Sequence, residues 1–275
     1  MATLRLFDSL GDYLSRSTSE GNVPNPMALV NYLGNWASNA YAALEKRALD
    51  RSMRILILSN LDWPSVDALT RLRPQLMQDE VAVMLSKRVG RVPAASEPFL
   101  APLGHADRAG WTSQLGLVGV RADDLEEAAR STLGDVLGCS VAFVQGINAP
   151  SGISRVQAFA PDLIVSIRFG EILRWPVIRS ARFGVLNLHS GLLPAFRGVM
   201  ATFWAMLGSA PRYGTTLHWI EDSGIDSGTI ISESLQPLDL DNTYLSNTLA
   251  LYPAGIEMLS DAIATLRQGR RLSGR

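Results

Sequence analysis

Cysteine is almost absent from this sequence of 275 residues, which contains Cys139 and no other thiol. A single cysteine cannot form a disulfide within the chain, so a reduced, cytoplasmic setting is the simplest expectation. An excess of charge of one sign is also lacking, because 25 basic and 26 acidic residues give a formal net charge of -1. This balance provides no general field that would draw the protein to nucleic acid, and we expect no nucleic-acid partner.

Long apolar runs are missing as well. No stretch approaches the roughly 20 residues that span a bilayer, and the start "MATLRLFDSLGDYLSR" lacks the basic and apolar blocks of a signal peptide. We therefore expect no membrane partner. Histidine is scarce too: His105, His189 and His218 stand at scattered positions. Together with one cysteine they form no convincing metal-ligand set, so we expect no metal.

The N-terminal residues 1–52 have the pattern of two helices joined by a breaker. The joining stretch "STSEGNVPNP" is rich in residues that disfavour helix, and an apolar stripe at spacings of three and four follows it. Residues 1–52 are therefore predicted to form a helical N-terminal extension, to which we assign no task.

Short apolar runs begin at residue 53 and are separated by helical or loop material. They are "MRILILSN", "EVAVML", "SVAFV" and "PDLIVSI". Strands that are apolar on both faces are typical of a buried parallel sheet built from βαβ units. Residues 53–275 are thus predicted to form one α/β domain with a mostly parallel sheet flanked by helices. We expect residues 87–121 to be loop-like and a last helix, Leu245 to Leu266, to be kinked or split at Pro253 and stopped by Gly269.

Two polar residues stand at the end of an apolar strand in "VLNLHSGLLPAFRG". Asn187 and His189 occupy alternate positions, so they should point the same way. In open parallel sheets, ligands bind beyond the carboxyl ends of the strands. An amide N–H and an imidazole at that edge could stabilise an oxygen that gains negative charge, and the imidazole can exchange a proton near neutral pH. An Asn-x-His pair at a strand end is about as often structural as functional, so this motif alone does not identify a site.

A carboxylate to orient the imidazole is offered by "LHWIEDSGIDSGTIISE". Of Glu221, Asp222 and Asp226 we choose Asp226, because Gly224 and Gly228 on either side allow the backbone to turn tightly. An Asp-Ser-Gly sequence is also an ordinary turn signal.

Three further residues are expected to be structural. His218, in the preceding β-like run, is expected to pack in the sheet or lie exposed, although alternation could turn it toward the site. Phe203 and Trp204, at helical spacing, are expected in the core.

Three motifs, in this order, resemble the folate-dependent formyltransferases: "APDLIVSIRFGEIL", "GVLNLHSGLLPAFRG" and "GTTLHWIEDSGIDSGTII". The resemblance runs from about residue 139 to 235 and leaves residues 1–52 uncovered. It implies a Rossmann-like domain that transfers a formyl group from 10-formyltetrahydrofolate to an amine, in one-carbon metabolism. It also implies that Pro194 follows a cis peptide bond.

The resemblance assigns roles residue by residue. Asn187, His189 and Asp226 match the catalytic trio: the amide and a protonated imidazole would stabilise the oxyanion, while Asp226 favours the imidazolium and helps to move the amine's proton. Two segments match the folate site. They are Arg168, Phe169, Gly170, Glu171 and Ile172, at a strand end, and Glu221, Asp222, Gly224 and Ile225, in the loop around the carboxylate.

Departures from relatives narrow the expected acceptor. The stretch "SNLDWPSVDAL" has no glycine and contains Asp62, so it does not resemble the phosphate cradle of glycinamide ribonucleotide transformylase. The chain ends with its last helix and is near neutral, unlike methionyl-tRNA formyltransferase. We therefore expect a small-molecule amine, such as an amino sugar, an amino acid or N-hydroxyornithine, on a route to a secondary metabolite. Asp62 or Glu171 could hold a cationic part of it, or lie exposed at the surface.

Two other activities and the oligomeric state stay open. A 10-formyltetrahydrofolate hydrolase could use the same trio with water in place of the amine. A non-catalytic folate- or nucleotide-binding module is the third alternative, and a homodimer is also compatible with the sequence.

Overall fold

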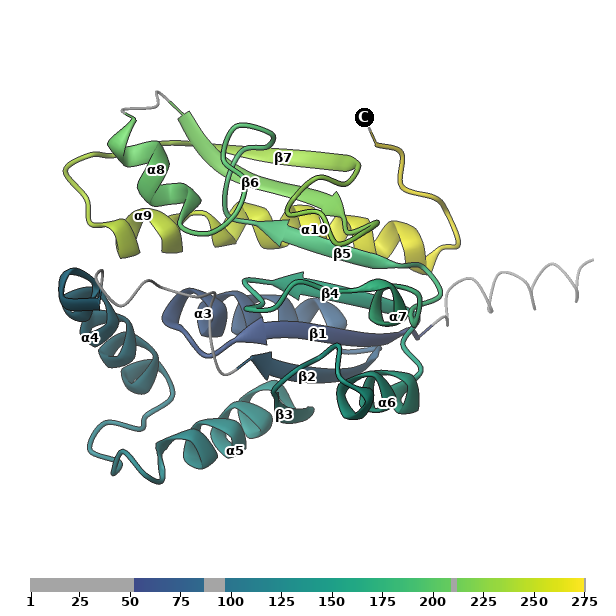
Figure 1. Ribbon diagram of the computed structural model, residues 1–275, viewed down its shortest axis with the longest axis horizontal. Coiled ribbons are helices and arrows are strands. Elements are labelled where there is room, and N and C mark those ends of the chain that lie inside the picture. Colours follow the sequence, from purple (N-terminus) through teal and green to yellow (C-terminus); the bar gives the residue numbers. More distant parts are fainter. Residues whose placement is uncertain (1–51, 87–96, 209–211, 275) are drawn as a thin grey trace, which may run out of the picture. The chain divides into compact units, whose positions relative to one another are not determined.

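The computed structural model describes residues 52–86, 97–208 and 212–274. Residues 1–51 of the predicted helical extension lie outside this part of the chain. The described residues form a seven-stranded sheet in the order β3-β2-β1-β4-β5-β6-β7 (Figure 1). The strands are β1 (Arg54–Asn60), β2 (Glu80–Ser86), β3 (Ser140–Val144), β4 (Leu163–Ile167), β5 (Val185–His189), β6 (Arg212–Trp219) and β7 (Ile230–Pro237).

The first five strands pair in parallel, whereas β6 and β7 run antiparallel to their neighbours. The predicted α/β class with a mostly parallel, Rossmann-like sheet is confirmed. Because β1 lies between β2 and β4, the chain reverses its direction of winding between β1 and β4, which is where such sheets hold ligands.

Helices cover both faces of the sheet. They are α3 (Trp63–Leu72), α4 (Glu97–Gln114), α5 (Leu125–Leu137), α6 (Pro150–Phe159), α7 (Trp175–Ile178), α8 (Ala201–Leu207), α9 (Tyr244–Ala250) and α10 (Tyr252–Arg267), with a 3-10 turn at Arg73–Leu76. Side chains that alternate along β1 divide the core: Ile55 and Ile57 pack with α3, α5 and α10, whereas Leu56 and Leu58 pack with α6 and α7. Figure 1 shows α3 and α10 behind the sheet and α6 in front of it.

The C-terminal helix is split as predicted. Helix α9 ends at Ala250 and α10 starts at Tyr252, with Pro253 in the first turn, where a missing N–H costs nothing. Gly269 follows α10 with a positive φ of 76° and donates its N–H to Leu266 O. Within the part of the chain that the structure describes, no helix combines the length and apolar character needed to cross a membrane.

The prediction of a loop over residues 87–121 is wrong for much of that stretch. Residues Glu97–Gln114 form α4, with Pro102 inside it. Tertiary contacts stabilise this helix, although its sequence has no clear helical pattern. Trp111 is buried in the core, and Asp107 accepts a hydrogen bond from the N–H of Trp63 at 2.8 Å. The helix therefore depends on packing against α3 rather than on a clear apolar stripe.

Candidate active site

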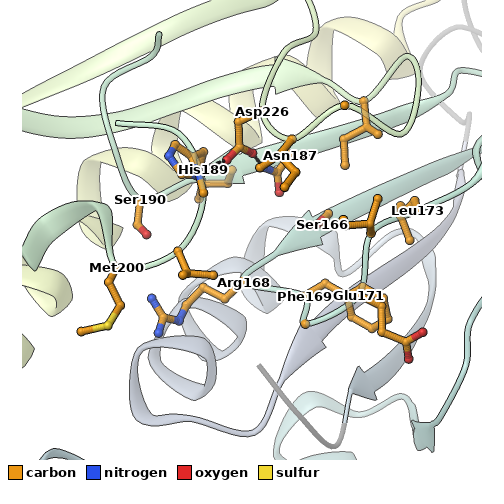
Figure 2. Close-up of a pocket in the computed structure, with 18 of the residues that line it drawn as sticks. Ser166, Arg168, Phe169, Glu171, Leu173, Asn187, His189, Ser190, Met200 and Asp226 are labelled. Atoms are coloured by element: carbon orange, nitrogen blue, oxygen red, sulfur yellow. Dashed lines mark hydrogen bonds and ion pairs between the residues drawn. The ribbon is translucent and has the colours of Figure 1, made fainter. Parts of the chain in front are cut away.

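A cavity of about 510 Å³ lies at the carboxyl ends of β4 and β5, and residues of the loop between β6 and β7 form part of its lining (Figure 2). All but one of the predicted site residues line it: Arg168, Phe169, Gly170, Glu171, Ile172, Asn187, His189, Asp222, Gly224, Ile225 and Asp226. Glu221 does not line the cavity. A space of this size suits a ligand larger than an amino acid.

Strand β5 delivers Asn187 and His189 to the cavity. Their neighbours Leu186 and Leu188 point to the opposite face, into the core with α10. Both polar residues are nearly buried, with 9% and 7% of their surface exposed. A buried amide and imidazole at a strand end need polar partners, and the structure provides them.

The loop after β6 brings Asp226 to this strand end. Glu221 braces the base of the loop by accepting hydrogen bonds from the N–H and the hydroxyl of Thr229. Gly228 lies so close to Trp219 that a Cβ would stand 1.9 Å from its carbonyl oxygen. Asp226 itself has a left-handed φ of 46°, and its Oδ2 accepts the N–H of Gly198 at 2.8 Å. Glu221 is therefore a support of the loop in this structure.

The imidazole of His189 lies between two acceptors. Its Nε2 is 2.6 Å from the carbonyl oxygen of Phe196, and its Nδ1 is 3.4 Å from Oδ2 of Asp226. A carbonyl can only accept, so Nε2 carries the proton in the neutral ring and Nδ1 is the basic atom. Proton uptake at Nδ1 would create a charged hydrogen bond to Asp226.

Burial and charge act in opposite directions on this pair. Burial lowers the pKa of His189 and outweighs the nearby Asp226 carboxylate and the Phe196 carbonyl, which raise it. For Asp226, burial would raise the pKa, but the hydrogen bond from His218, the charge of His189 and the Gly198 amide together lower it. The free protein therefore holds a neutral imidazole beside a carboxylate.

His218 also faces this cluster, contrary to the expected role in sheet packing or at the surface. It lies directly opposite Asn187 in the antiparallel pairing of β5 and β6 and is 1% exposed. Its Nε2 is 3.0 Å from Nδ2 of Asn187 and 3.3 Å from Oδ1 of Asp226. The same Nδ2 donates to Oδ1 of Asp226 at 3.3 Å. The antiparallel register, which brings the two residues together, was the signal missing at the sequence level.

The segment after β4 is held by contacts that its sequence does not suggest. The carboxylate of Glu171 accepts the N–H groups of Gly146 and Ile147 at 2.9 and 3.0 Å. The N–H of Gly170 donates to the hydroxyl of Ser86 at 3.0 Å. These bonds fix the backbone of the cavity wall. The expectation that Glu171 is an exposed surface group is wrong.

Asp62 and Arg168 form a nearly buried ion pair beside the cavity. Nε of Arg168, a residue with a left-handed φ of 56°, lies 3.1 and 3.0 Å from the two oxygens of Asp62. Asp62 also caps α3 by accepting the N–H of Ser65. The expectation that Asp62 lies exposed at the surface is therefore wrong. Its carboxylate is already engaged by Arg168 and by the start of α3, so it is not free to bind a cationic acceptor.

Other lining residues carried no sequence signal of their own. Ser166, Met200 and Tyr244 face the cavity from β4, the start of α8 and the start of α9. In α8, Phe203 and Trp204 are 39% and 53% exposed, so the expectation that they are core residues is wrong. The Leu193–Pro194 peptide bond beside the site is cis. Among the described residues, no group of three or more His, Cys, Asp and Glu side chains could hold a metal ion.

Comparison with protein families matches residues 147–262 to the formyl transferase family. In sequence, the chain is 30% identical over 120 residues to methionyl-tRNA formyltransferase of Synechococcus sp. (strain JA-3-3Ab), which covers 44% of this chain and 37% of that protein. It is 29% identical over 124 residues to that of Geotalea uraniireducens (strain Rf4), with coverage of 45% and 39%. The chain thus spans less than two-fifths of the length of these relatives.

Solved structures share the fold at lower sequence identity. Glycinamide ribonucleotide transformylase 1 from Symbiobacterium toebii superposes with a TM-score of 0.58 at 19% identity, covering 82% of this chain and 92% of that one. A sugar N-formyltransferase from Shewanella sp FDAARGOS_354 gives a TM-score of 0.50 at 17% identity, with coverage of 80% and 72%.

Proposed function

We propose that this chain, which matches the formyl transferase family over residues 147–262, transfers a formyl group from 10-formyltetrahydrofolate to the amine of a small molecule. The observation that carries the proposal is the contact of His189 Nδ1 with Asp226 Oδ2, 3.4 Å apart in the cavity wall. Such a pair can take a proton from an attacking amine and keep the resulting charge beside a carboxylate.

The cavity lining agrees with a folate donor. The wall is largely apolar, with Phe169, Ile172 and Ile225 among its residues, which suits an aromatic ligand. Backbone of the Arg168–Ile172 segment, fixed by Ser86 and Glu171, offers polar groups at defined positions. We assign the pterin to this segment and to the loop residues Asp222, Gly224 and Ile225.

The side chains of the site divide the work of one acyl transfer. When bound, the donor supplies the formyl carbon; a C–N bond forms to the amine and the bond to the folate nitrogen breaks. His189 accepts the amine's proton at Nδ1. Its Nε2–H continues to donate a hydrogen bond to the carbonyl oxygen of Phe196, which fixes the tautomer. Asp226 stabilises the imidazolium, whose positive charge then lies beside the developing oxyanion. The proton returns to the folate nitrogen as the bond to it breaks.

A small-molecule amine is the proposed acceptor. The near-neutral charge of the sequence provides no general attraction for tRNA. Asp62, which follows β1, uses its carboxylate to cap α3 and to pair with Arg168, so a negative group stands where a phosphate would need donors. An amino sugar, an amino acid or N-hydroxyornithine remains the proposed class, within the biosynthesis of a secondary metabolite.

The test is a screen of amines with 10-formyltetrahydrofolate, with tetrahydrofolate release and product mass as the two measurements. The panel contains nucleotide-linked amino sugars, amino acids, N-hydroxyornithine and methionyl-tRNA. At least one small amine should give a product heavier by one formyl group in place of hydrogen. His189→Ala should lower turnover by about 10²–10⁴-fold while the affinity for a folate analogue changes little. His105→Ala, at an exposed histidine of α4, is the matched control.

Other results of the screen would overturn the proposal. Formate release at full rate without any amine would indicate a hydrolase. Folate binding without turnover on any acceptor would indicate a binding module. Formylation of methionyl-tRNA alone would replace the proposed acceptor class but keep the reaction.

A further inference from the structure

The guanidinium of Arg168 is a charged group of the cavity that the proposed reaction does not use. The backbone of this residue belongs to the segment assigned to the pterin, but its side chain runs the other way. Figure 2 shows the guanidinium on the side of Ser190 and Met200, whereas Phe169 lies toward the opposite end. After the larger effect of burial, the charge of Arg168 is one of the effects that lower the pKa of His189. The guanidinium and the basic imidazole therefore line one connected space.

The surrounding structure holds this guanidinium in place. Its Nε lies 3.1 and 3.0 Å from the two oxygens of Asp62, a carboxylate that is itself fixed by the N–H of Ser65. The backbone of Arg168 has a left-handed φ of 56°, which residues other than glycine rarely adopt and which occurs often at functional sites. The side chain is 18% exposed. Arg168 is therefore oriented before any ligand binds.

Most of the donors of Arg168 are left over by these contacts. A guanidinium has five N–H groups, and Asp62 accepts the one on Nε. The buried hydroxyl of Tyr252 lies near; burial raises its pKa to about 12, although the charge of Arg168 lowers it. This hydroxyl is thus neutral and can accept one N–H, but it adds no counter-charge. In residues 52–86, 97–208 and 212–274, the other three N–H groups have no acceptor.

The charges at this end of the cavity indicate which ligand suits these donors. Arginine binds carboxylates and phosphates, often through two parallel hydrogen bonds. Asp62 contacts Arg168, and after burial its charge is the next effect that raises the pKa of Asp107, so a second carboxylate lies nearby. A dianionic phosphate would be repelled by both carboxylates, whereas a ligand carboxylate carries half that charge. A carboxylate is therefore the better partner.

We propose that Arg168 binds a carboxylate of the acceptor and so determines its class: an amine with a free carboxylate, such as an amino acid or N-hydroxyornithine, rather than a nucleotide-linked amino sugar. The inference rests on the proposed formyl transfer and deepens it. Arg168 would not touch the reacting atoms. It holds the acceptor by its carboxylate at one end of the cavity, and the amine then lies within reach of His189.

The test compares each acceptor with its own carboxamide, which has almost the same shape but no charge. The panel contains N-hydroxyornithine, ornithine and the common amino acids, each paired with its carboxamide and assayed with 10-formyltetrahydrofolate. The preferred acid should exceed its carboxamide in kcat/KM by about 10–100-fold, the range for a hydrogen bond between charged groups.

The double variant Asp62→Asn/Arg168→Gln removes the ion pair without leaving a buried charge unpaired. Its kcat/KM for the acid should fall by about 10–100-fold, whereas its kcat/KM for the carboxamide and its KM for the folate should change less than about threefold. Equal losses for acid and carboxamide would overturn the proposal, because altered packing would explain them. A rise confined to the KM for 10-formyltetrahydrofolate would also overturn it, since Arg168 would then bind the glutamate of the donor. Arg197→Gln, at an exposed arginine of the loop after β5, is the matched control and should keep the native preference.

A binding measurement distinguishes failure of this proposal from failure of the proposed function. Calorimetric titration with each acid and its carboxamide, with and without tetrahydrofolate, requires no turnover. A preference for an acid that the double variant loses, without formylation of any amine, would support the carboxylate subsite and reject the transferase. Formylation with no preference for acid over carboxamide, or of an amino sugar alone, would overturn the subsite and keep the reaction. Equal binding of every acid and its carboxamide would overturn it as well.

Discussion

Nδ1 of His189 and Oδ2 of Asp226 are 3.4 Å apart, although one lies at the end of β5 and the other in the loop after β6. Other hydrogen bonds fix both side chains. The N–H of Gly198 donates to the same carboxylate oxygen, and Nε2 on the other side of the imidazole contacts the carbonyl oxygen of Phe196. The pair is therefore oriented before any ligand binds. Preorganised groups of this kind need no rearrangement when charge develops.

Asp226→Asn tests the electrostatic part of this contact. The carboxylate raises the pKa of His189 against the larger, opposite effect of burial, so its removal should lower that pKa further. The neutral, basic form of His189 would then persist to lower pH, and the acid limb of kcat should move to lower pH. The plateau of kcat should fall by about 10²–10³-fold, because the imidazolium loses its stabilising charge. Profiles of kcat against pH for the two proteins measure both effects; an unmoved limb, or one moved to higher pH, would contradict the assigned coupling.

Asp62→Asn tests the nearly buried ion pair with Arg168. The two side chains are 18% and 10% exposed, and an amide can still cap α3 but leaves the guanidinium without its counter-charge. The free energy of unfolding should fall by about 3 kcal/mol, which urea denaturation measures. The matched control is Asp67→Asn within α3, the helix that Asp62 caps; its partner Arg71 is 47% exposed. Asp67→Asn should lower the free energy of unfolding by less than about 0.5 kcal/mol. Equal losses in the two variants would show that the Asp62–Arg168 pair stabilises the fold no more than the exposed pair does.

Gly228→Ala tests how the loop carries Asp226. A methyl group there would lie 1.9 Å from the carbonyl oxygen of Trp219, so the strand ends would have to separate. We expect a loss of stability of about 1–3 kcal/mol and a larger fractional loss of kcat, because Asp226 moves with the loop. Gly104→Ala in α4 is the control: no atom lies within 4 Å of its added Cβ, and alanine should stabilise the helix by about 1 kcal/mol. Full activity in Gly228→Ala would disprove the link between this close approach and the position of Asp226.

The parts of the fold that the sequence predicted are those in which local pattern and tertiary environment agree. The run "PDLIVSI" is mostly apolar because β4 is buried on both faces, and Asn187 and His189 share a direction because a strand alternates. Helix α4 was missed, since its stability comes from contacts of Trp111 and Asp107 with other elements. His218 was misjudged because its direction depends on the register between β5 and β6, which no single strand contains. The helical spacing of Phe203 and Trp204 could not reveal whether their face meets the core.

Asp107→Asn provides a prediction about stability and pH that is independent of activity. Burial, and then the charge of Asp62, raise the pKa of Asp107 to about 6, whereas its pKa in the unfolded chain is about 3.9. Between these two values the folded protein binds a proton that the unfolded chain has lost, so stability falls as the pH rises from about 4 to about 6. Above that window the loss in the free energy of unfolding is about 1–2 kcal/mol once solvent screening of this partly exposed group is allowed for.

Asp107→Asn keeps an oxygen that can accept the Trp63 N–H but cannot ionise. The variant should therefore be more stable than the native protein at neutral pH and equally stable near pH 4 (about the unfolded pKa). Thermal melts of both proteins across this range decide the matter, and a constant difference at every pH would show that Asp107 does not titrate as described.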